Sequence, residues 1–348
     1  EWGRSYSFEE NRKWWVVTDM GEFLIKRILL CLLILFFVMF IVYALMFSLP
    51  TSYVETMARE LATKPGSLKS ASEWLAELNA SYGFDRGVVG GYFHWLGSVV
   101  KGDFGDSWYW TVPVTQKLND TVWVSFWMGL IAFILEVAIA IPLGVTAARK
   151  QYSVTDYAVT VFGLIGISMP TFFTATIYKL IFSVKLGWFD IGGMQGRNYH
   201  LLSPTGQFFD VCLHFVLPIL TLVTVSIGSL MRYTRTNMLE VLSSDYIRTA
   251  RAKGLSEKKV INHHAFRNTL IPLVTILGGS LPGLFSGALI TETLFAIRGI
   301  GYASYHSMIN GDIPFTMFYL AFLSILTLLG NLISDILYAV VDPRVRVH

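Results

Sequence analysis

Charged residues are scarce in this chain of 348 residues. Only 15% of its positions are Asp, Glu, Lys or Arg, whereas 53% are hydrophobic, and the mean hydropathy is +0.53. A soluble domain needs more polar surface, so the composition excludes an ordinary water-soluble fold and predicts a membrane protein. The formal net charge of +3 is small, so the placement of charges says more about partners than their total, and no nucleic-acid partner is expected.

Cysteine is nearly absent as well. Cys31 and Cys212 lie in or beside apolar runs and show neither CxxC nor Cys/His spacing, so no disulfide framework is predicted. His263 and His264 are adjacent, which does not place two ligands on one helix face, and no cysteine or carboxylate joins them. We therefore expect no metal site.

Three catalytic motifs are missing. A phosphate-binding loop requires G-x-x-x-x-G-K-[ST], because its backbone amides and lysine hold the phosphates, and the dipeptide Gly-Lys never occurs. The HExxH pattern of zinc proteases and the G-x-S-x-G pattern of serine hydrolases are also absent. The chain is therefore expected to be non-catalytic and to bind no cofactor of its own.

Long apolar runs are what the sequence does contain. The first of them is uncharged, is long enough to cross a hydrocarbon core of about 30 Å, and lacks the cleavage site of a signal peptide. The pattern predicts an all-α polytopic protein with six transmembrane helices. The predicted spans are 28–49, 121–147, 157–184, 211–231, 270–291 and 314–341.

Lysine and arginine are distributed unevenly between the two faces. The faces that include the termini carry 17 of them and the opposite faces carry eight, so the positive-inside rule predicts that both termini are cytoplasmic. The expected organisation is a cytoplasmic extension 1–27, a first helix 28–49, an extracytoplasmic segment 50–119, a five-helix core 120–341 with a basic loop 232–269, and a cytoplasmic C-terminus 342–348.

The segment 50–119 contains a polar, weakly helical stretch at 72–80, followed by a group of aromatic residues. Such aromatics are typical of a belt at the membrane interface, and a passive cap on the bilayer competes with a binding surface as the interpretation. The residues concerned are Tyr92, Phe93, Trp95, Trp108, Tyr109 and Trp110.

Eight lysines and arginines gather between Arg232 and Arg267. In this loop Ser244 and Asp245 are favourable at a helix N-terminus, and Gly254 suits the left-handed position that ends a helix. We therefore predict a short helix from Asp245 to Lys253, a sharp turn, and a second helix capped by Ser256.

On the first predicted helix Tyr246, Ile247 and Ala250 share one side, whereas Arg248, Arg251 and Lys253 are spread over the rest. Such a helix offers a small apolar ridge framed by charge. Charge alone does not separate a ridge that binds a protein from a basic loop that rests on anionic lipid.

The run "EVLSSDYIRTARAKGLSEKKVINHHAFRNTLIP" closely resembles the cytoplasmic signature loop of the membrane subunits of bacterial ABC importers, in the form found in the dipeptide/oligopeptide permease B-subunit family. In that family the helix before the glycine is the coupling helix, which sits in a groove of an ATPase subunit. The resemblance implies this role for Asp245, Tyr246, Ile247, Arg248, Thr249, Ala250, Arg251, Ala252, Lys253 and Gly254.

Further similar phrases follow in the family's order, among them "YFHWLGSVVKGDFGDS", "IPLGVTAARK", "HFVLPILTL" and "NLISDILYAVVDPRVR". Two features depart from the family's sequence pattern. The first 23 residues resemble an extension that typical members lack, and Arg298 stands where the family usually has proline. The resemblance implies a type I ABC importer permease fold in the bacterial cytoplasmic (inner) membrane.

The implied partners are a homologous second permease subunit, two ATPases that bind ATP and Mg, and an extracytoplasmic substrate-binding protein or lipoprotein. The implied cargo is a di- or oligopeptide. Nickel or another small ligand carried by the same machinery is the alternative.

Three glycines in the fifth predicted span, Gly279, Gly283 and Gly287, are spaced to lie on one helical face. Such a ladder permits close approach of a second helix, and Pro272 and Pro282 favour a kink. A packed helix that lines a gate is one interpretation, and a static packing seam is the other.

Two carboxylates are candidates for the transport path. Glu136 lies in the middle of the second predicted span and is expected to face either the path or a polar partner on another helix. Glu292, near the outer end of the fifth, is the candidate for an outer gate or for contact with a docking partner. A gradient-driven secondary transporter, with ion sites at Glu136 and Asp335, is a further alternative.

Overall fold

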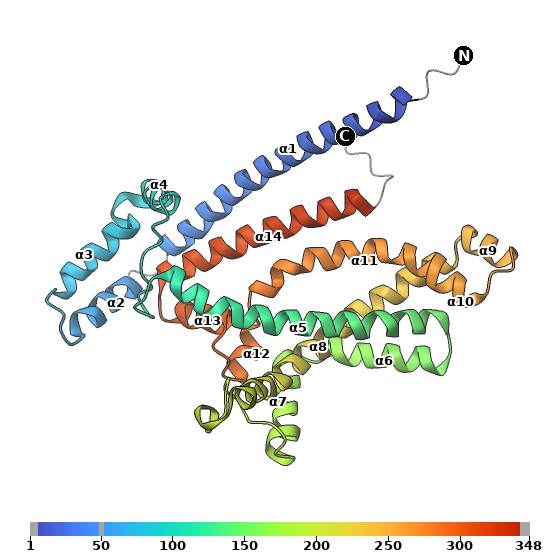
Figure 1. The fold of residues 1–348 in the computed structure, drawn as a ribbon. Coiled ribbons are helices and arrows are strands. Elements are labelled where there is room, and N and C mark those ends of the chain that lie inside the picture. Colours follow the sequence, from blue (N-terminus) through green and yellow to red (C-terminus); the bar gives the residue numbers. More distant parts are fainter. Residues whose placement is uncertain (1–5, 49–51, 342–348) are drawn as a thin grey trace. The chain divides into compact units, whose positions relative to one another are not determined.

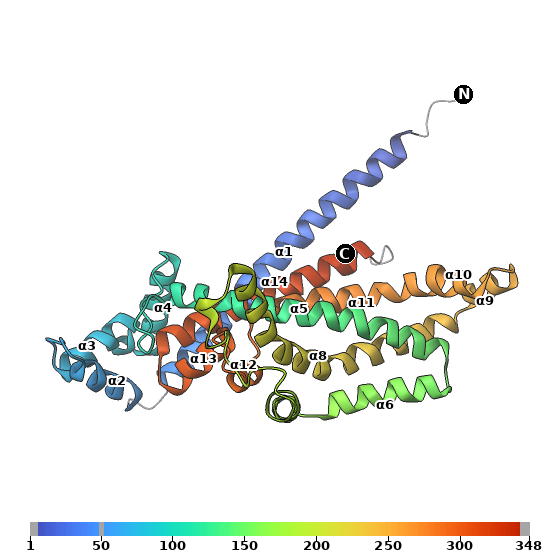
Figure 2. The same cartoon turned by 60° about the horizontal axis from the view of Figure 1, so that its bottom comes forward.

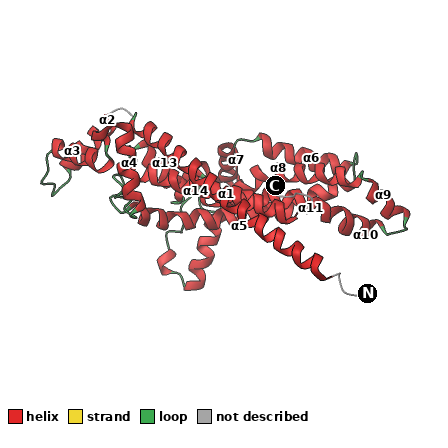
Figure 3. Ribbon diagram, turned by 90° about the horizontal axis from the view of Figure 1, so that it is seen from above, coloured by secondary structure: helices red, strands yellow, loops and turns green. Residues whose placement is uncertain are grey.

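The computed structural model describes residues 6–48 and 52–341. These residues are mostly helical and form no strand, apart from an isolated bridge between Asp106 and Pro113 (Figure 3). The fold is therefore all-α, as predicted. The predicted C-terminus 342–348 lies outside the described residues, as does the end of the first predicted span at Leu49. The chain divides into two units, Glu1–Val114 with Ser307–His348, and Thr115–His306.

The predicted spans fall on helices of suitable length and composition. Within the described residues four helices are each long and apolar enough to cross a membrane, and two bent helix pairs raise this number to six. The four are α1 (Tyr6–Phe47), α5 (Val114–Arg149), α8 (Pro204–Leu242) and α14 (Ile313–Val341).

The third predicted span is broken rather than continuous. It consists of α6 (Val154–Ser168) and α7 (Thr171–Tyr178), the latter extended by a π-helix over Lys179–Lys185, and the two halves bend by 103°. Met169 is extended and Pro170 precedes α7. Proline lacks an amide proton and disfavours the helical conformation of the residue before it, which accounts for the break.

The fifth predicted span is displaced along the chain. After α9 (Asp245–Ala252), α10 (Glu257–Lys259) leads through a π-helical turn, Val260–Ala265, into α11 (Phe266–Ser280) and a 3-10 turn. The two halves of this span, Glu257–Leu270 and Pro272–Phe285, are bent by 47° relative to each other. The predicted end at Thr291 is therefore wrong, because that residue belongs to the separate helix α12 (Leu289–Leu294), which precedes α13 (Ile300–Ile309).

The first unit contains three helices in the segment that follows α1: α2 (Ser52–Thr63), α3 (Ala71–Tyr82) and α4 (Gly87–Val100) (Figure 1). The polar stretch at 72–80 lies in α3, whose N-terminus is stabilised by a capping box between Ser70 and Glu73.

The aromatic side chains of this segment do not all form an interface belt. Tyr92, Trp95 and Trp108 are buried, and the Tyr92 hydroxyl donates a 2.8 Å hydrogen bond to the carbonyl of Phe36 on α1. The predicted belt is wrong for these three, because they pack with Tyr43 into a core that joins α1 and α4. Phe93 and Tyr109 are exposed.

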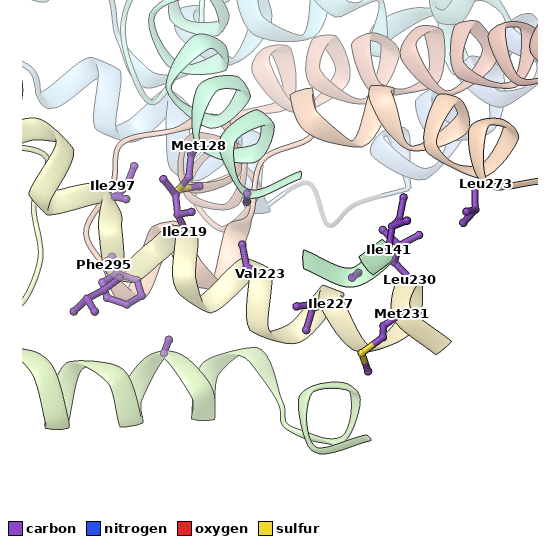
Figure 4. Packing of buried hydrophobic residues seen from close by; sticks show 14 residues of the cluster. Met128, Ile141, Ile219, Val223, Ile227, Leu230, Met231, Leu273, Phe295 and Ile297 are labelled. Carbon is purple, nitrogen blue, oxygen red and sulfur yellow. The ribbon is translucent and has the colours of Figure 1, made fainter. Parts of the chain in front are cut away.

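The second unit is built around α8. Ile219, Val223, Ile227 and Met231 recur along this helix at helical spacing and are buried (Figure 4). The helices α6 and α11 pack with α8, and so does α5, whose buried residues share one cluster with those of α8. The helices α9 and α10 lie beyond the end of α5 (Figures 1 and 2). The short basic helix thus occupies one end of the unit, and α12 lies near the other.

Candidate functional site

The α9 turn, residues 244–259, has the helix-turn-helix form predicted from the sequence. The helix α9 starts at Asp245, and Gly254 has φ +76°, the left-handed conformation that glycine adopts at little cost. The Gly254 amide donates a 2.9 Å hydrogen bond to the carbonyl of Arg251. The helix ends at Ala252, one residue before the predicted end.

Ser244 does not act as the predicted side-chain cap. It occupies the position before α9 with extended backbone, but its hydroxyl donates a 2.6 Å hydrogen bond to the carbonyl of Val241, at the end of α8. A serine hydroxyl at such a junction can hydrogen-bond with the backbone of the preceding turn or with that of the following helix, and here it bonds with the preceding turn. Asp245 still places a negative charge in the first turn of α9.

The apolar side of α9 packs against its own chain. Ile247 is fully buried and Ala250 is nearly so, in a cluster with Met238, Val260 and Ala265. The apolar ridge predicted from the sequence is therefore not free for a partner, because these residues anchor the helix to α8 and to the segment after the turn.

The opposite side of α9 is open to solvent. Tyr246, which was predicted to share the apolar ridge, is 48% exposed. Arg248 and Asp245 lie 3.6 Å apart, but both are so exposed that this ion pair contributes little. The exposed residues between Asp245 and Lys253, here called the α9 face, are Asp245, Tyr246, Arg248, Thr249, Arg251, Ala252 and Lys253.

An ion pair that sequence reasoning missed closes the turn. Arg251 donates two hydrogen bonds to the carboxylate of Glu257, at 2.8 and 3.2 Å. The Arg251 guanidinium holds the pKa of Glu257 below its usual value, so the pair is ionised at neutral pH. The six-residue separation of an arginine and a glutamate across a glycine was the available signal.

The three glycines Gly279, Gly283 and Gly287 do not form the predicted ladder. Gly279 lies in α11, Gly283 lies in the 3-10 turn Leu281–Phe285, which contains Pro282, and Gly287 has φ +77° outside any helix. A shared helical face requires α-helical backbone throughout, so this prediction is wrong. Their role in a gate stays a prediction.

Gly287 instead lets two backbone segments meet. A Cβ atom at Gly287 would lie 2.3 Å from the amide nitrogen of Gly301, at the start of α13. No side chain larger than hydrogen fits there. The residues 286–302, here called the α12 turn, are thereby folded tightly on themselves.

Glu292 is completely buried at the centre of the α12 turn. One carboxylate oxygen accepts hydrogen bonds from the Ser125 hydroxyl (2.6 Å) and the Ala288 amide (2.9 Å), and the other accepts one from the Tyr302 amide (2.8 Å). Ser125 in turn accepts from the amide of Ile300 at 2.8 Å. The carboxylate thus satisfies donors from three segments of the chain.

This arrangement corrects the expectation for Glu292. Because the side chain has no exposed surface, it offers nothing to a docking partner, and contact with one is ruled out in this conformation. An outer-gate role stays a prediction. Ser125 was missed, since nothing in the sequence around a mid-helix serine marks it as the partner of a distant glutamate. Arg298, also in this turn, is exposed and lines a cavity of about 410 Å³ with Met194 and Tyr302.

Glu136 is half-buried on α5 and lies within hydrogen-bonding reach of Ser226 on α8. A polar partner on another helix was one of the two predicted surroundings, and its place in a transport path stays untested. The side chain of Asp335 lies outside the described residues. No group of three or more His, Cys, Asp or Glu suited to hold a metal occurs in the part of the chain that the structure describes.

Two family models match the chain. The "Binding-protein-dependent transport system inner membrane component" matches residues 140–347, which include the α9 turn and the α12 turn. The "Binding-prot-dependent transport system membrane comp, N-term" matches residues 20–113. Residues before position 20 lie outside both.

Curated relatives align over nearly their whole length. The oligopeptide transport system permease protein AppB of Bacillus subtilis is 35% identical over 328 residues, which cover 94% of this chain and 100% of the relative. The dipeptide transport system permease protein DppB of Escherichia coli K12 is 32% identical over 343 residues, covering 94% and 99%.

A solved structure has the same fold. A chain of the MetNI methionine ABC transporter, in an inward-facing conformation, aligns with a TM-score of 0.50 and 18% identity. The alignment covers 66% of this chain and 98% of that one. At this sequence identity the structural similarity supports the type I ABC importer permease fold and gives no information about the cargo.

The resemblance first seen in the basic loop therefore extends to both family models, to full-length relatives and to a solved fold. The chain belongs to the binding-protein-dependent transport inner-membrane component family, in the branch of the dipeptide and oligopeptide permease B subunits, and is a multi-pass membrane subunit of an ABC importer.

Proposed function

We propose that this chain forms part of the path for di- or oligopeptides and is moved by an ATPase that grips the α9 face. The observation that carries the proposal is the division of α9 into two sides. Ile247 and Ala250 fix the helix to the chain, while Tyr246 and Arg248 remain exposed at the end of the long helices. The peptide cargo is supported by the printed names of relatives at 32–35% identity.

The proposed assembly contains a second, homologous permease subunit, two ATPases that bind ATP and Mg, and an extracytoplasmic binding protein or lipoprotein. In this assembly the chain supplies a path and no catalytic group, which accords with the absence of a Gly-Lys dipeptide. The excess of lysine and arginine on one set of faces supports cytoplasmic termini and a cytoplasmic α9.

Movement of the ATPases reaches the membrane only if α9 moves as one body with the long helices. Its anchoring to α8 and to the segment after the turn meets this requirement. The ATP-bound ATPase pair must also bind one permease conformation better than the other, since equal binding shifts no equilibrium.

A paired charge reversal tests this function in proteoliposomes that contain the complete importer. Arg248→Glu alters the α9 face, and Lys258→Glu makes the same change at an exposed position of α10. We expect Arg248→Glu to lower ATP-dependent peptide uptake at least tenfold and to weaken co-purification of the ATPases, with normal membrane insertion. Equal effects of the two variants, or uptake by this chain without ATP, would contradict the proposal.

A further inference from the structure

A groove lies between α6 and α8, beside the point where the two helices come closest. A Cβ atom on Gly228 would lie 2.2 Å from the carbonyl oxygen of Gly163, and one on Gly166 would lie 2.5 Å from that of Thr224. The backbones therefore touch, and side chains are forced to either flank of the crossing. On one flank they enclose a cavity of about 370 Å³.

The lining of this groove changes from polar to apolar along its length. Arg232, Arg235 and Thr236 line it on α8, next to Thr160 on α6. Farther along α6 the lining is apolar and includes Leu164 and Ile167.

The polar end lies at a definite depth in the helix. Arg232 is the first charged residue of α8 after the run 211–231, which contains no Asp, Glu, Lys or Arg. The polar end therefore falls where a spanning helix leaves the hydrocarbon, and the apolar end lies within it. An amphiphile in a bilayer has the same order of polarity.

The charged side chains at the polar end of the groove carry a net charge of +1. Arg235 donates two hydrogen bonds to Asp156, at 2.7 and 2.8 Å, and the Asp156 side chain is only 4% exposed. This pair is neutral as a whole and holds the start of α6 on α8. Arg232 is exposed, so the three groups together match one singly charged anion.

The neighbouring surface of α6 suits lipid rather than water. Val161, Phe162 and Ile165 are each at least half exposed. Apolar side chains this exposed on a spanning helix are ordinary where acyl chains surround it.

We propose that this groove binds one anionic phospholipid, with its phosphate on Arg232 and Thr236 and one acyl chain along Leu164 and Ile167. The bound lipid would hold α6 and α8 together beside the crossing, where glycines provide no side chains that could interdigitate. It does not depend on α9 or on the cargo.

Native mass spectrometry of the full chain, released from nanodiscs of equal phosphatidylglycerol and phosphatidylcholine, tests the proposal. One arginine at a lipid surface changes affinity on the order of fivefold. We expect one retained phosphatidylglycerol per chain at about that preference. Arg232→Gln should abolish the preference, and Lys150→Gln, which removes an exposed cation outside the groove, should not.

A steric pair tests the position of the acyl chain. Leu164→Trp fills the groove, whereas Ile165→Trp adds the same bulk to an exposed site on the same helix, so only the first should lose the lipid. If Leu164→Trp fails to fold, immobilisation of spin-labelled phosphatidylglycerol over phosphatidylcholine by the unaltered chain decides instead. An excess of glycerophosphoglycerol, which has the headgroup and no acyl chain, should not displace the lipid.

Several results would overturn the proposal. They are equal retention of the two lipids, equal behaviour of Arg232→Gln and Lys150→Gln, and displacement by the soluble headgroup. In the complete importer, a photo-crosslinker at position 164 should capture lipid. Capture of the second permease subunit instead would show that a protein covers the groove.

Discussion

The α9 turn and the α12 turn of the second unit contain the same two residue types, glycine and glutamate, but in different surroundings. Each contains a glycine in the left-handed conformation, Gly254 at φ +76° and Gly287 at φ +77°, and each contains a glutamate that closes the turn. They lie at different ends of the long helices (Figures 1 and 2).

The surroundings of the two turns differ. A Cβ atom on Gly254 would meet no atom within 4 Å, whereas one on Gly287 would collide with the backbone of Gly301. Glu257 is about half exposed and pairs with Arg251, whereas Glu292 is fully buried and accepts from backbone amides. Glycine and glutamate therefore form an enclosed turn around Glu292 and a solvent-exposed turn around Glu257.

Removal of Glu292 should have the largest effect. Glu292→Ala leaves two amides and the Ser125 hydroxyl without their acceptor in a buried site, at a cost of about 1–3 kcal/mol each before relaxation. We expect a loss of about 3–5 kcal/mol, seen as a lower Tm of the detergent-solubilised protein. Glu292→Gln, which keeps the shape and one acceptor, should lie between. If Glu257→Ala were equally destabilising, the distinction between the turns would fail.

The matched glycines come next. Gly254→Ala introduces only conformational strain, about 1 kcal/mol, because its surroundings are empty. Gly287→Ala adds a steric clash to the same strain, so a total of about 2–5 kcal/mol is expected. Thermal unfolding of the two variants side by side measures the difference. Equal losses would mean that the backbone around Gly301 yields easily.

Ile247 tests whether α9 is held by its own chain. Ile247→Ala removes a fully buried side chain and should cost about 2–4 kcal/mol, expressed as faster amide exchange in residues 245–252. Tyr246→Ala, at the exposed neighbouring position, should change exchange little while lowering uptake. The reverse pattern would mean that the buried and exposed sides of α9 have been assigned wrongly.

The Arg251 and Glu257 pair should have the smallest effect. Exposed pairs contribute at most about 1 kcal/mol, and salt screens them. Because the pKa of Glu257 is lowered in the folded chain, its contribution is present above the ordinary glutamate value of about 4.3 and is lost as the pH falls through the lower folded value. Spin labels at positions 249 and 258 should report a wider turn at low pH, and Arg251→Ala should remove this pH dependence.

Much of the α9 turn could be predicted because its determinants are local. Asp245 at the start, Gly254 at the end and charges on most sides specify a short helix and a turn without reference to distant residues. The details that were predicted wrongly depend on residues outside the turn. Whether Ser244 caps α8 or α9, and which side of α9 is buried, depend on what α8 and the segment after the turn present to it.

The α12 turn could hardly be predicted. Gly279, Gly283 and Gly287 have the right spacing for a helical ladder, yet the α-helix ends at Ser280, before the second of them. Glu292 is bound by Ser125, which lies 167 residues away along the chain. A periodic pattern carries no information about such a pairing.

By itself the sequence determined that this is a membrane protein, roughly where its spans lie, where charge gathers, and where the short basic helix begins and turns. These properties follow from hydropathy, charge and backbone preference, which act over a few neighbouring residues. Only the tertiary structure decided that the third span is sharply bent, that Ile247 and Tyr92 are buried, and that Glu292 is enclosed. Burial and hydrogen bonding depend on which distant segments come together, and packing of the whole chain sets that.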